Sequence, residues 1–461
     1  IDDAISIEKL ENGHYRLGVH IADVSYYVEE DSPLDVNAMN RGTSVYLVDR
    51  VIPMLPHQLS NGICSLNEGV DRLAVSCIME IDERARIVDY DIKESVICSR
   101  KKMTYTAVNS ILENNIIPDG YAEFVPTLKL MAELAEILRR EKLARGYLDF
   151  DVDEAKIIVD ENCHPIDIKV RERGVGENLI EDFMIIANEC IATHIFYLDL
   201  VGIYRIHEVP EEEKIREFLS YIGTLGYSYH GNVKDVSPKV VQGILNFLKD
   251  KKECKILSSL LLRSMKKAVY STNNVGHYGL ASKIYTHFTS PIRRYPDTTI
   301  HRLLKKYVFH PDINVDSLHH LESKLVFIAE NSSLRERASI NCEREVEDMK
   351  MAEYMEDHIG EEFDGMIASL TNFGMFIQLD NLVEGMCRYQ DMNDYFHFDE
   401  KTMTVSGERT HVCYHLGDKV RVRVVAASKE MQTIDFKIVD RNHLDLNSSE
   451  SKNKNFSLEK M

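Results

Sequence analysis

The sequence has 461 residues, of which 44% are hydrophobic and 28% are charged, and its formal net charge is −20. It contains no run of about 18 uncharged apolar residues, which excludes a transmembrane helix, and its nine cysteines include no CxxC pair, which argues against a zinc ribbon or a disulfide framework. The negative charge disfavours a broadly basic nucleic-acid-binding surface, although a narrow basic groove inside an acidic exterior stays compatible with it.

The length predicts roughly two to four folded domains. Scattered cysteines are typical of reduced thiols in a cytoplasmic protein, which is the localisation we expect. The chain begins abruptly at Ile1 without an initiator methionine and shows no signal peptide, so we interpret it as a fragment or a processed chain.

The first 28 residues predict a β-hairpin. Apolar and polar residues alternate on both sides of Asn12-Gly13, a dipeptide typical of tight hairpin turns. Asp2 and Asp3 then lie at the mouth of the first strand. Adjacent carboxylates in this position are either a solvated strand end or oxygen ligands for magnesium, and the pair alone does not decide between the two.

Residues 38–72 are rich in Gly, Pro and Asn and predict a long functional loop outside the core. Tyr46 lies in this segment between Arg41 and Arg50, where an aromatic ring can stack on a nucleobase or pack half-buried against the protein. Strand alternation returns over residues 73–99, and Tyr105 follows at the start of a predicted helix.

The middle of the chain is mainly helical. Apolar residues at helical spacing predict an amphipathic helix over 122–145, and two strands follow within 148–170. Residues 177–198 predict a buried helix that carries Glu181 and Asp182. Buried carboxylates need partners, which are either a structural arginine or, at a functional site, an RNA ribose or a catalytic arginine. A short strand over 203–210 and helices over 211–270 complete this part.

The stretch Tyr285–Lys306 carries a local excess of four positive charges in an otherwise acidic chain. Its Thr289-Ser290-Pro291 segment predicts a loop that leads into a helix, with Arg293 and Arg294 close to the helix N-terminus. Backbone N–H groups at that end favour a phosphate, and guanidinium matches phosphate oxygens in pairs. A solvated basic face and internal salt bridges are the alternatives.

The last 140 residues change from helix to strand. Residues 320–358 predict a long helix with mixed charges, including Glu336, Glu343 and Glu345. Five short β-like runs within 359–440 are typical of an OB-fold barrel, on which Phe373 and Phe376 are candidates for stacking on bases. One of the two phenylalanines could instead fill the barrel core. Residues 441–461 form a polar tail.

Taken together, the motifs IDDAIS, GVHIADVS, NRGTSVYLVDRVIPMLP, LIEDFMIIANE, YRIHEVP and HFTSPIRRYPDTTIHRLL closely resemble the ribonuclease II superfamily, in the same order along residues 1–440. The resemblance implies an α+β fold, with a large mixed catalytic domain over 1–355 followed by an all-β OB-fold barrel over 359–440. It further implies processive, magnesium-dependent 3′-to-5′ hydrolysis of RNA to nucleoside 5′-monophosphates.

The same resemblance assigns catalytic roles. Asp2 and Asp3 match the last two of four metal-binding aspartates in the family motif, and the first two would lie upstream of Ile1. Arg293 matches the arginine at the scissile phosphate, and Arg294 lies next to it.

The remaining matched residues are implied to contact RNA. Tyr46 and Tyr105 are similar to aromatic residues that stack near the 3′ end, Glu181 to a glutamate that contacts the terminal ribose, and Glu336 to a glutamate of the 3′-nucleotide pocket. The Glu336 assignment is the weakest, because SSLRERAS departs from the commoner ERRA pattern.

We therefore expect a monomeric exoribonuclease that degrades single-stranded RNA 3′ ends and structured RNA with 3′ overhangs. The main alternative is a non-catalytic RNA-binding relative that retains the channel but has lost the metal. An endonuclease is a weaker alternative, and it would differ by cutting circular RNA.

Overall fold

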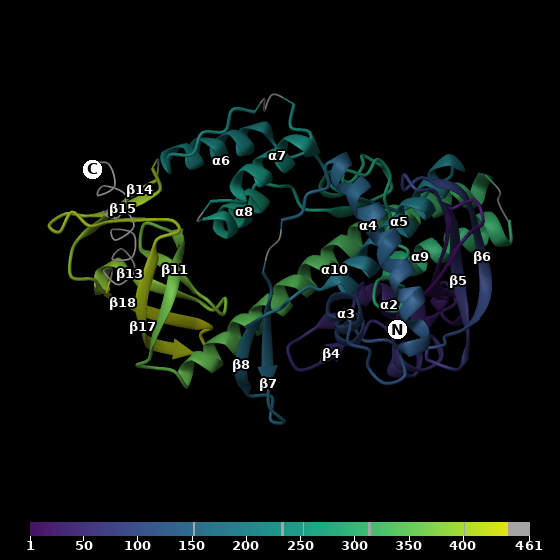
Figure 1. Ribbon diagram of the computed structural model, residues 1–461, viewed down its shortest axis with the longest axis horizontal. Helices are drawn as coiled ribbons and strands as arrows, with labels where there is room; N and C mark the ends of the chain where they lie inside the picture. Colours follow the sequence, from purple (N-terminus) through teal and green to yellow (C-terminus); the bar gives the residue numbers. More distant parts are fainter. Residues whose placement is uncertain (151–152, 232–234, 252, 312–314, 401, 441–461) are drawn as a thin grey trace, which may run out of the picture.

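The structure is a computed structural model that describes residues 1–150, 153–231, 235–251, 253–311, 315–400 and 402–440 (Figure 1). Helices and strands are mixed up to residue 356, and an all-β module follows, so the predicted α+β architecture with a terminal barrel is confirmed. The predicted polar tail lies outside the described residues. No helix within the described ranges is long and apolar enough to span a membrane.

A four-stranded antiparallel sheet organises the N-terminal part. Its order is β1-β2-β5-β6, from β1 (Asp3–Lys9), β2 (Tyr15–Ala22), β5 (Asp71–Ile81) and β6 (Ile87–Cys98). The predicted hairpin is present, because Lys9 pairs with Tyr15 across a turn in which Gly13 has a φ of +86°. Alternate residues of β2, such as Leu17, Val19 and Ile21, are fully buried. One face of the sheet therefore builds the core.

Helices from several parts of the chain surround this sheet. The chain order gives α1 (Val24–Tyr27), α2 (Pro33–Arg41), α3 (Tyr105–Asn114), α4 (Val125–Arg145), α5 (Val175–Tyr197) and α9 (Tyr295–Leu304). Helix α5 is apolar along most of its length and packs against α4, α3 and the buried face of the sheet. The predicted helices over 122–145 and 177–198 are confirmed to within a few residues at each end.

The segment 38–72 differs from its prediction. It contains the end of α2, the small hairpin of β3 (Val45–Tyr46) and β4 (Val51–Ile52), and a π-helical turn at Gln58–Ile63. Met54, Leu55, Cys64 and Leu66 are almost completely buried. The segment therefore contributes to the core. This contribution could not be predicted, because the Gly and Pro residues interrupt the hydrophobic periodicity of the segment.

Two small two-stranded antiparallel sheets and a helical lobe connect the four-stranded sheet to the barrel. The first is a hairpin of β7 (Ala155–Val159) and β8 (Pro165–Val170), and the second pairs β9 (Tyr204–Ile206) with the distant β10 (Val269–Ser271). The lobe consists of α6 (Glu212–Thr224), α7 (Pro238–Leu248) and α8 (Cys254–Arg263). Figure 1 shows the long helix α10 (Val315–Glu356) running from the sheet to the barrel, and it contacts β3, β8 and β17 along the way.

The C-terminal module is a closed five-stranded barrel in the order β11-β12-β13-β18-β17. Its strands are β11 (Glu362–Leu370), β12 (Gly374–Leu379), β13 (Glu384–Arg388), β17 (Lys419–Ser428) and β18 (Thr433–Asp440), which are the five predicted runs. A three-stranded sheet of β14 (Phe396–Asp399), β15 (Thr404–Gly407) and β16 (Cys413–His415) is inserted between β13 and β17. The sequence pattern did not predict this insertion.

Buried apolar residues form two clusters. The first lies between the four-stranded sheet, α4, α5, α9 and the first part of α10. The second joins the barrel interior to α6–α8, to Ile168 of β8 and to Met355 at the end of α10. The barrel is therefore packed against the helical lobe through a shared core.

Candidate active site

The two aspartates at the chain start are held between a strand and a distant loop. The Asp2 carbonyl accepts a hydrogen bond from the Ala22 N–H at 2.8 Å, and Asp3 pairs with Ile21 in the sheet. The Ile292 N–H donates to Asp2 Oδ1 at 2.8 Å. This contact brings residues 290 positions apart into one site.

Burial dominates the electrostatics of this pair. It raises the pKa of Asp2 to about 6, while the Ile292 N–H and the Arg293 charge act in the opposite direction. Burial also raises the pKa of Asp3. Within the described residues, no other residue donates a hydrogen bond to Asp2 Oδ2 or to the Asp3 carboxylate, and neither residue forms an ion pair with a side chain. Carboxylates in such an environment are stabilised by a bound cation, and hard oxygen ligands suit magnesium.

The same two carboxylates do not form a complete metal centre with other side chains. Among the described residues, no group of three or more His, Cys, Asp or Glu side chains is close enough to hold a metal ion. Magnesium commonly binds through one or two protein carboxylates and completes its coordination with water and phosphate. Asp2 and Asp3 fit this partial ligand set.

Arg293 and Arg294 have different environments despite being adjacent. The Arg293 carbonyl accepts from the Ser44 N–H at 3.0 Å and from Thr43 Oγ1 at 3.1 Å, which fixes the backbone. Its guanidinium is exposed and, within the described ranges, forms neither a hydrogen bond nor an ion pair. The Arg293 charge lowers the pKa of Asp2 and Asp3, so the guanidinium lies within electrostatic range of both carboxylates.

Arg294 is instead part of the scaffold. It occupies the N-cap position of α9, and its Nη2 donates to Asp297 Oδ2 at 2.7 Å, where Asp297 is fully buried. The loop that the sequence predicts before this helix is present, and the Ser290 carbonyl accepts from the Arg294 N–H at 2.9 Å, but no described side chain caps the helix. This pairing favours a scaffold role, and a direct contact of Arg294 with a phosphate stays a prediction.

Most of the basic excess in Tyr285–Lys306 is neutralised inside the protein. Arg302 pairs with Asp35 at 2.7 Å, and Lys305 pairs with Asp23 at 2.7 Å. Arg293 and Lys306 are the members of the stretch that form no ion pair with a described residue. The alternative of internal salt bridges therefore holds for most of the stretch, and Arg293 is the charge left at the candidate site.

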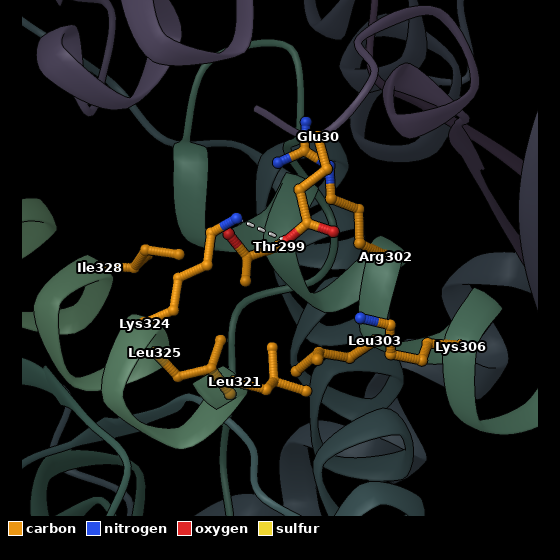
Figure 2. A pocket seen from close by; sticks show the side chains of 9 residues that line it. All are labelled: Glu30, Thr299, Arg302, Leu303, Lys306, Leu321, Lys324, Leu325 and Ile328. Carbon is orange, nitrogen blue, oxygen red and sulfur yellow. Dashed lines mark hydrogen bonds and ion pairs between the residues drawn. The ribbon is translucent and has the colours of Figure 1, made fainter. Parts of the chain in front are cut away.

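Lys306 lies at a separate small cavity between α9 and α10 (Figure 2). In this cavity Lys324 Nζ donates to Glu30 Oε1 at 2.8 Å. Its volume is about 20 Å³, which admits one water molecule and no nucleotide. The lining residues are Glu30, Thr299, Arg302, Leu303, Lys306, Leu321, Lys324, Leu325 and Ile328.

Two half-exposed tyrosines flank the carboxylates and Arg293. Tyr46 is 48% exposed and Tyr105 is 46% exposed. Partial burial raises the pKa of both, and the Arg293 charge opposes the rise in each case, so both rings lie within the field of this guanidinium. Exposed aromatic faces beside a cation are suited to stacking on bases of a phosphate-bearing chain.

Gly42 allows Tyr46 to reach this position. It has a φ of +69°, and a Cβ atom there would lie 2.6 Å from Cβ of Arg335 on α10. The Gly42 carbonyl also accepts from the Tyr295 N–H at 3.0 Å. The chain therefore passes tightly between α9 and α10 just before Tyr46.

Neither of the two predicted glutamates contacts the Asp2 and Asp3 carboxylates, Tyr46 or Tyr105 within the described residues. Glu336 forms a two-point ion pair with Arg205 at 2.7 and 3.0 Å. Glu181 accepts from the Tyr147 hydroxyl at 3.0 Å and from Lys142 Nζ at 3.5 Å, on the α4 side of α5. Their predicted RNA contacts remain predictions.

Glu343 is a site residue that the sequence analysis did not select. Its Oε1 accepts from the Tyr46 N–H at 2.8 Å and from Ser339 Oγ at 3.0 Å. It follows Glu336 by seven residues, which is two turns of the same helix. That spacing is the signal that could have identified it.

The barrel aromatics lie outside the barrel core. Phe373, in the turn between β11 and β12, is 56% exposed. Phe376 is half-buried on β12, where its neighbours Met375 and Ile377 point inward and are fully buried. Neither phenylalanine fills the interior, so both rings stay available on the surface.

Comparison with known proteins shows two family matches. The RNB domain matches residues 1–310, and the S1 RNA binding domain matches residues 356–438. Ribonuclease R 1 of Lactococcus lactis is 47% identical over 438 residues, and Ribonuclease R of Thermotoga maritima is 45% identical over 446 residues. Each alignment covers 95% of this chain but only 54% and 62% of these relatives, so the chain spans about half to three-fifths of their length.

Solved structures agree with these matches. The apo form of Mycoplasma genitalium RNase R superposes with a TM-score of 0.90 at 32% identity, over 95% of this chain and 69% of that one. The same protein in complex with ribose-methylated single-stranded RNA also gives a TM-score of 0.90. Yeast Ssd1, described as a pseudonuclease, gives 0.71 at 20% identity and shares the fold alone.

Proposed function

Because this chain belongs to the RNB family, we propose that it is a 3′-to-5′ exoribonuclease that hydrolyses single-stranded RNA to nucleoside 5′-monophosphates. The observation that carries the proposal is the meeting of two half-buried carboxylates, whose pKa values are raised, with an exposed arginine that has no ion-pair partner in the described chain. Two half-exposed tyrosines beside them supply surfaces for bases. Carboxylate, guanidinium and aromatic groups are those that phosphodiester hydrolysis in RNA requires.

Each residue has a distinct task in this proposal. The Arg293 guanidinium binds the non-bridging oxygens of the scissile phosphate and offsets charge that develops on them. Tyr46 and Tyr105 stack on the terminal bases and hold the phosphate in place. Glu343 fixes the backbone of Tyr46 through a hydrogen bond. Arg294 keeps the loop rigid through Asp297.

Magnesium is the cofactor that these residues would accept. Asp2 and Asp3 would hold it, and when bound it would lower the pKa of a water molecule and neutralise phosphate charge. The raised pKa of both carboxylates supports this assignment, because a bound cation would relieve the cost of their burial.

The surface outside the site supports an RNA substrate. The exposed Phe373 and the half-buried Phe376 on the S1-type barrel offer rings on which single-stranded RNA can stack. We infer that the barrel retains RNA between successive cleavages, which would make hydrolysis processive. Structured RNA would then be a substrate where a 3′ overhang reaches the site. We propose a monomer acting in the cytoplasm.

A time course on 5′-labelled single-stranded RNA with magnesium tests this function. We expect progressive shortening from the 3′ end, nucleoside 5′-monophosphate as the product, and no cleavage of circular RNA of the same sequence. RNA that is bound but remains intact would identify a binding protein instead. Cleavage of the circle would identify an endonuclease.

A further inference from the structure

His287 lies in the loop that leads to Arg293, and its environment is built by several elements. The extended segment around it is anchored by the Arg205 N–H, which donates to the Tyr285 carbonyl at 2.9 Å, and by Thr286 Oγ1, which donates to the Ile203 carbonyl at 2.6 Å. The His287 ring meets Tyr270 and Tyr285 edge to face, with centroids 5.6 and 5.7 Å apart. The ring orientation is therefore fixed on two sides.

A hydrogen bond from Tyr270 sets the tautomer of His287. The Tyr270 hydroxyl lies 2.8 Å from His287 Nδ1, which is its one hydrogen-bond partner among the described residues. Burial raises the pKa of Tyr270, so the phenol stays protonated. Tyr270 is almost fully buried and Nδ1 is the one described partner of its hydroxyl, so the arrangement that leaves no buried O–H without an acceptor is the one in which the hydroxyl donates to Nδ1. In that tautomer Nδ1 accepts and the ring proton resides on Nε2.

The support for Tyr270 continues into α10. The Tyr270 N–H donates to Ser333 Oγ at 2.9 Å, and the Arg205 guanidinium lies 4.7 Å from the centre of the Tyr270 ring. Arg205 is itself held by the two-point ion pair with Glu336. Glu336 therefore supports His287 indirectly, through Arg205 and Tyr270.

His287 is neutral and keeps a free donor. Burial and the charges of Arg294, Arg205 and Arg293 keep the pKa of His287 well below its usual range. The His287 side chain is half-buried. Its Nε2 atom is not fully buried and forms no hydrogen bond with a described residue. Its Nε2–H is therefore open to a ligand within the field of Arg293.

We propose that His287 is a further RNA-binding residue, whose Nε2–H donates to an RNA oxygen next to the phosphate held by Arg293. The acceptor is a non-bridging phosphate oxygen or a ribose hydroxyl, both of which accept a hydrogen bond from neutral imidazole. The identity of the ligand rests on the proposed function. The contact adds affinity and orientation without adding charge.

Binding of a fluorescent RNA decamer, measured in the Asp2→Asn background to prevent cleavage, tests the inference. His287→Phe removes the donor and should weaken binding about tenfold. His287→Gln retains an N–H near the same position and should stay within about threefold of the parent. His310→Phe is the matched control, because His310 is an exposed histidine that contacts Glu94 and not the site.

Salt dependence separates a neutral contact from loss of a charge. His287→Phe should leave the slope of log Kd against log salt unchanged, whereas Arg293→Ala should reduce it by about 0.7 for one phosphate contact on a single strand. Decamers with one methylphosphonate or one 2′-deoxyribose distinguish the acceptors. The modification that removes the true acceptor should weaken RNA binding by the parent chain and leave RNA binding by His287→Phe unchanged.

Several results would overturn the inference. Equal binding by folded His287→Phe and the parent would show that Nε2 contacts no RNA, as would equal damage from the glutamine and phenylalanine variants. In either case RNA shortening by the wild-type chain would leave the proposed function standing. A wild-type chain that neither binds nor cuts RNA would refute the proposed function. It would also refute the His287 contact, which rests on that function.

Discussion

The Ile292 N–H donates a hydrogen bond to Asp2 Oδ1 at 2.8 Å and so connects the first strand of the sheet to the loop that carries Arg293. One oxygen of Asp2 is used for this structural contact, and the other oxygen is left for a ligand. The positions of the carboxylate and of the guanidinium are therefore coupled, because the backbone next to Arg293 rests on Asp2.

Asp2→Asn should abolish RNA hydrolysis while leaving RNA affinity unchanged or slightly higher. Asparagine Oδ1 can still accept from Ile292, so the loop keeps its position, but the charge needed for a cation is lost. Single-turnover cleavage and binding of the same RNA measure the two effects. Asp31→Asn, at an exposed residue paired with Lys324, is the control. Normal turnover by Asp2→Asn would exclude a metal-binding role.

Tyr46→Ala should lengthen the final product by at least one nucleotide, because removal of the ring weakens stacking of the terminal bases. Glu343→Gln keeps the shape of the side chain but replaces its charge with an amide, so the bond to the Tyr46 N–H should weaken and give a smaller change in the same direction. Gel analysis of end products provides the measurement. If the final product of Tyr46→Ala has the same length as that of the parent, the stacking site lies elsewhere.

The sequence was most informative where local pattern determines structure. The Asn12-Gly13 turn and the five alternating runs of the barrel were predicted because hairpins and strands depend on neighbouring residues. The inserted strands β14–β16 were missed. They are only three or four residues long, which is too short to show clear alternation.

Long-range pairing could not be predicted from the sequence. The Arg302–Asp35 and Lys305–Asp23 ion pairs join residues more than two hundred positions apart, so the basic character of their stretch was overestimated. Similarly, Glu336 and Glu343 are both glutamates on one helix, and only the fold shows that Glu343 contacts the hairpin of Tyr46 while Glu336 pairs with Arg205.

Replacing both Phe373 and Phe376 with alanine should weaken binding of long RNA by at least about thirtyfold, since each stacked base contributes about 1–3 kcal/mol and the loss of two sums to at least about 2 kcal/mol. Cleavage of tetranucleotides should change little, because we expect an RNA this short, held at Arg293, not to extend to the barrel. Substitution is preferable to removal of residues 359–461, since the barrel interior shares a core with α6–α8. Equal affinity for long RNA in the double variant would exclude these rings from the RNA path.

Stability should fall as the pH decreases below about 6.5, before most carboxylates protonate. Burial lowers the pKa of His277 to about 3, and it also lowers the pKa of His207, His287 and His301. At these four histidines the unfolded chain then binds more protons than the folded chain between about pH 6.5 and pH 3, so their protonation favours unfolding in this window, whereas the raised pKa of Asp2 acts in the opposite direction. Urea denaturation at pH 7.5 and pH 5 measures the change.

His277→Gln should reduce this pH dependence, because glutamine does not titrate. His310→Gln, at an exposed histidine, is the matched control for general effects of substitution. A pH dependence that is the same in His277→Gln and in the parent would show that burial of this imidazole does not oppose its protonation.

The buried ion pair between Lys142 and Asp182 links α4 to α5 beneath Glu181. Both residues are 3% exposed, and Lys142 Nζ donates to Asp182 Oδ1 at 2.5 Å. Lys142→Met should destabilise the fold by about 3–5 kcal/mol, because it leaves the buried Asp182 carboxylate with the more distant Arg139 guanidinium at 4.0 Å in place of its 2.5 Å partner. The double variant Lys142→Met with Asp182→Leu should recover much of this loss, since it removes both charges from the apolar environment. Urea denaturation of the two variants at pH 7.5 separates the cost of an unpaired charge from the loss of packing. Equal instability of the single and double variants would show that the pair acts through shape and not through charge.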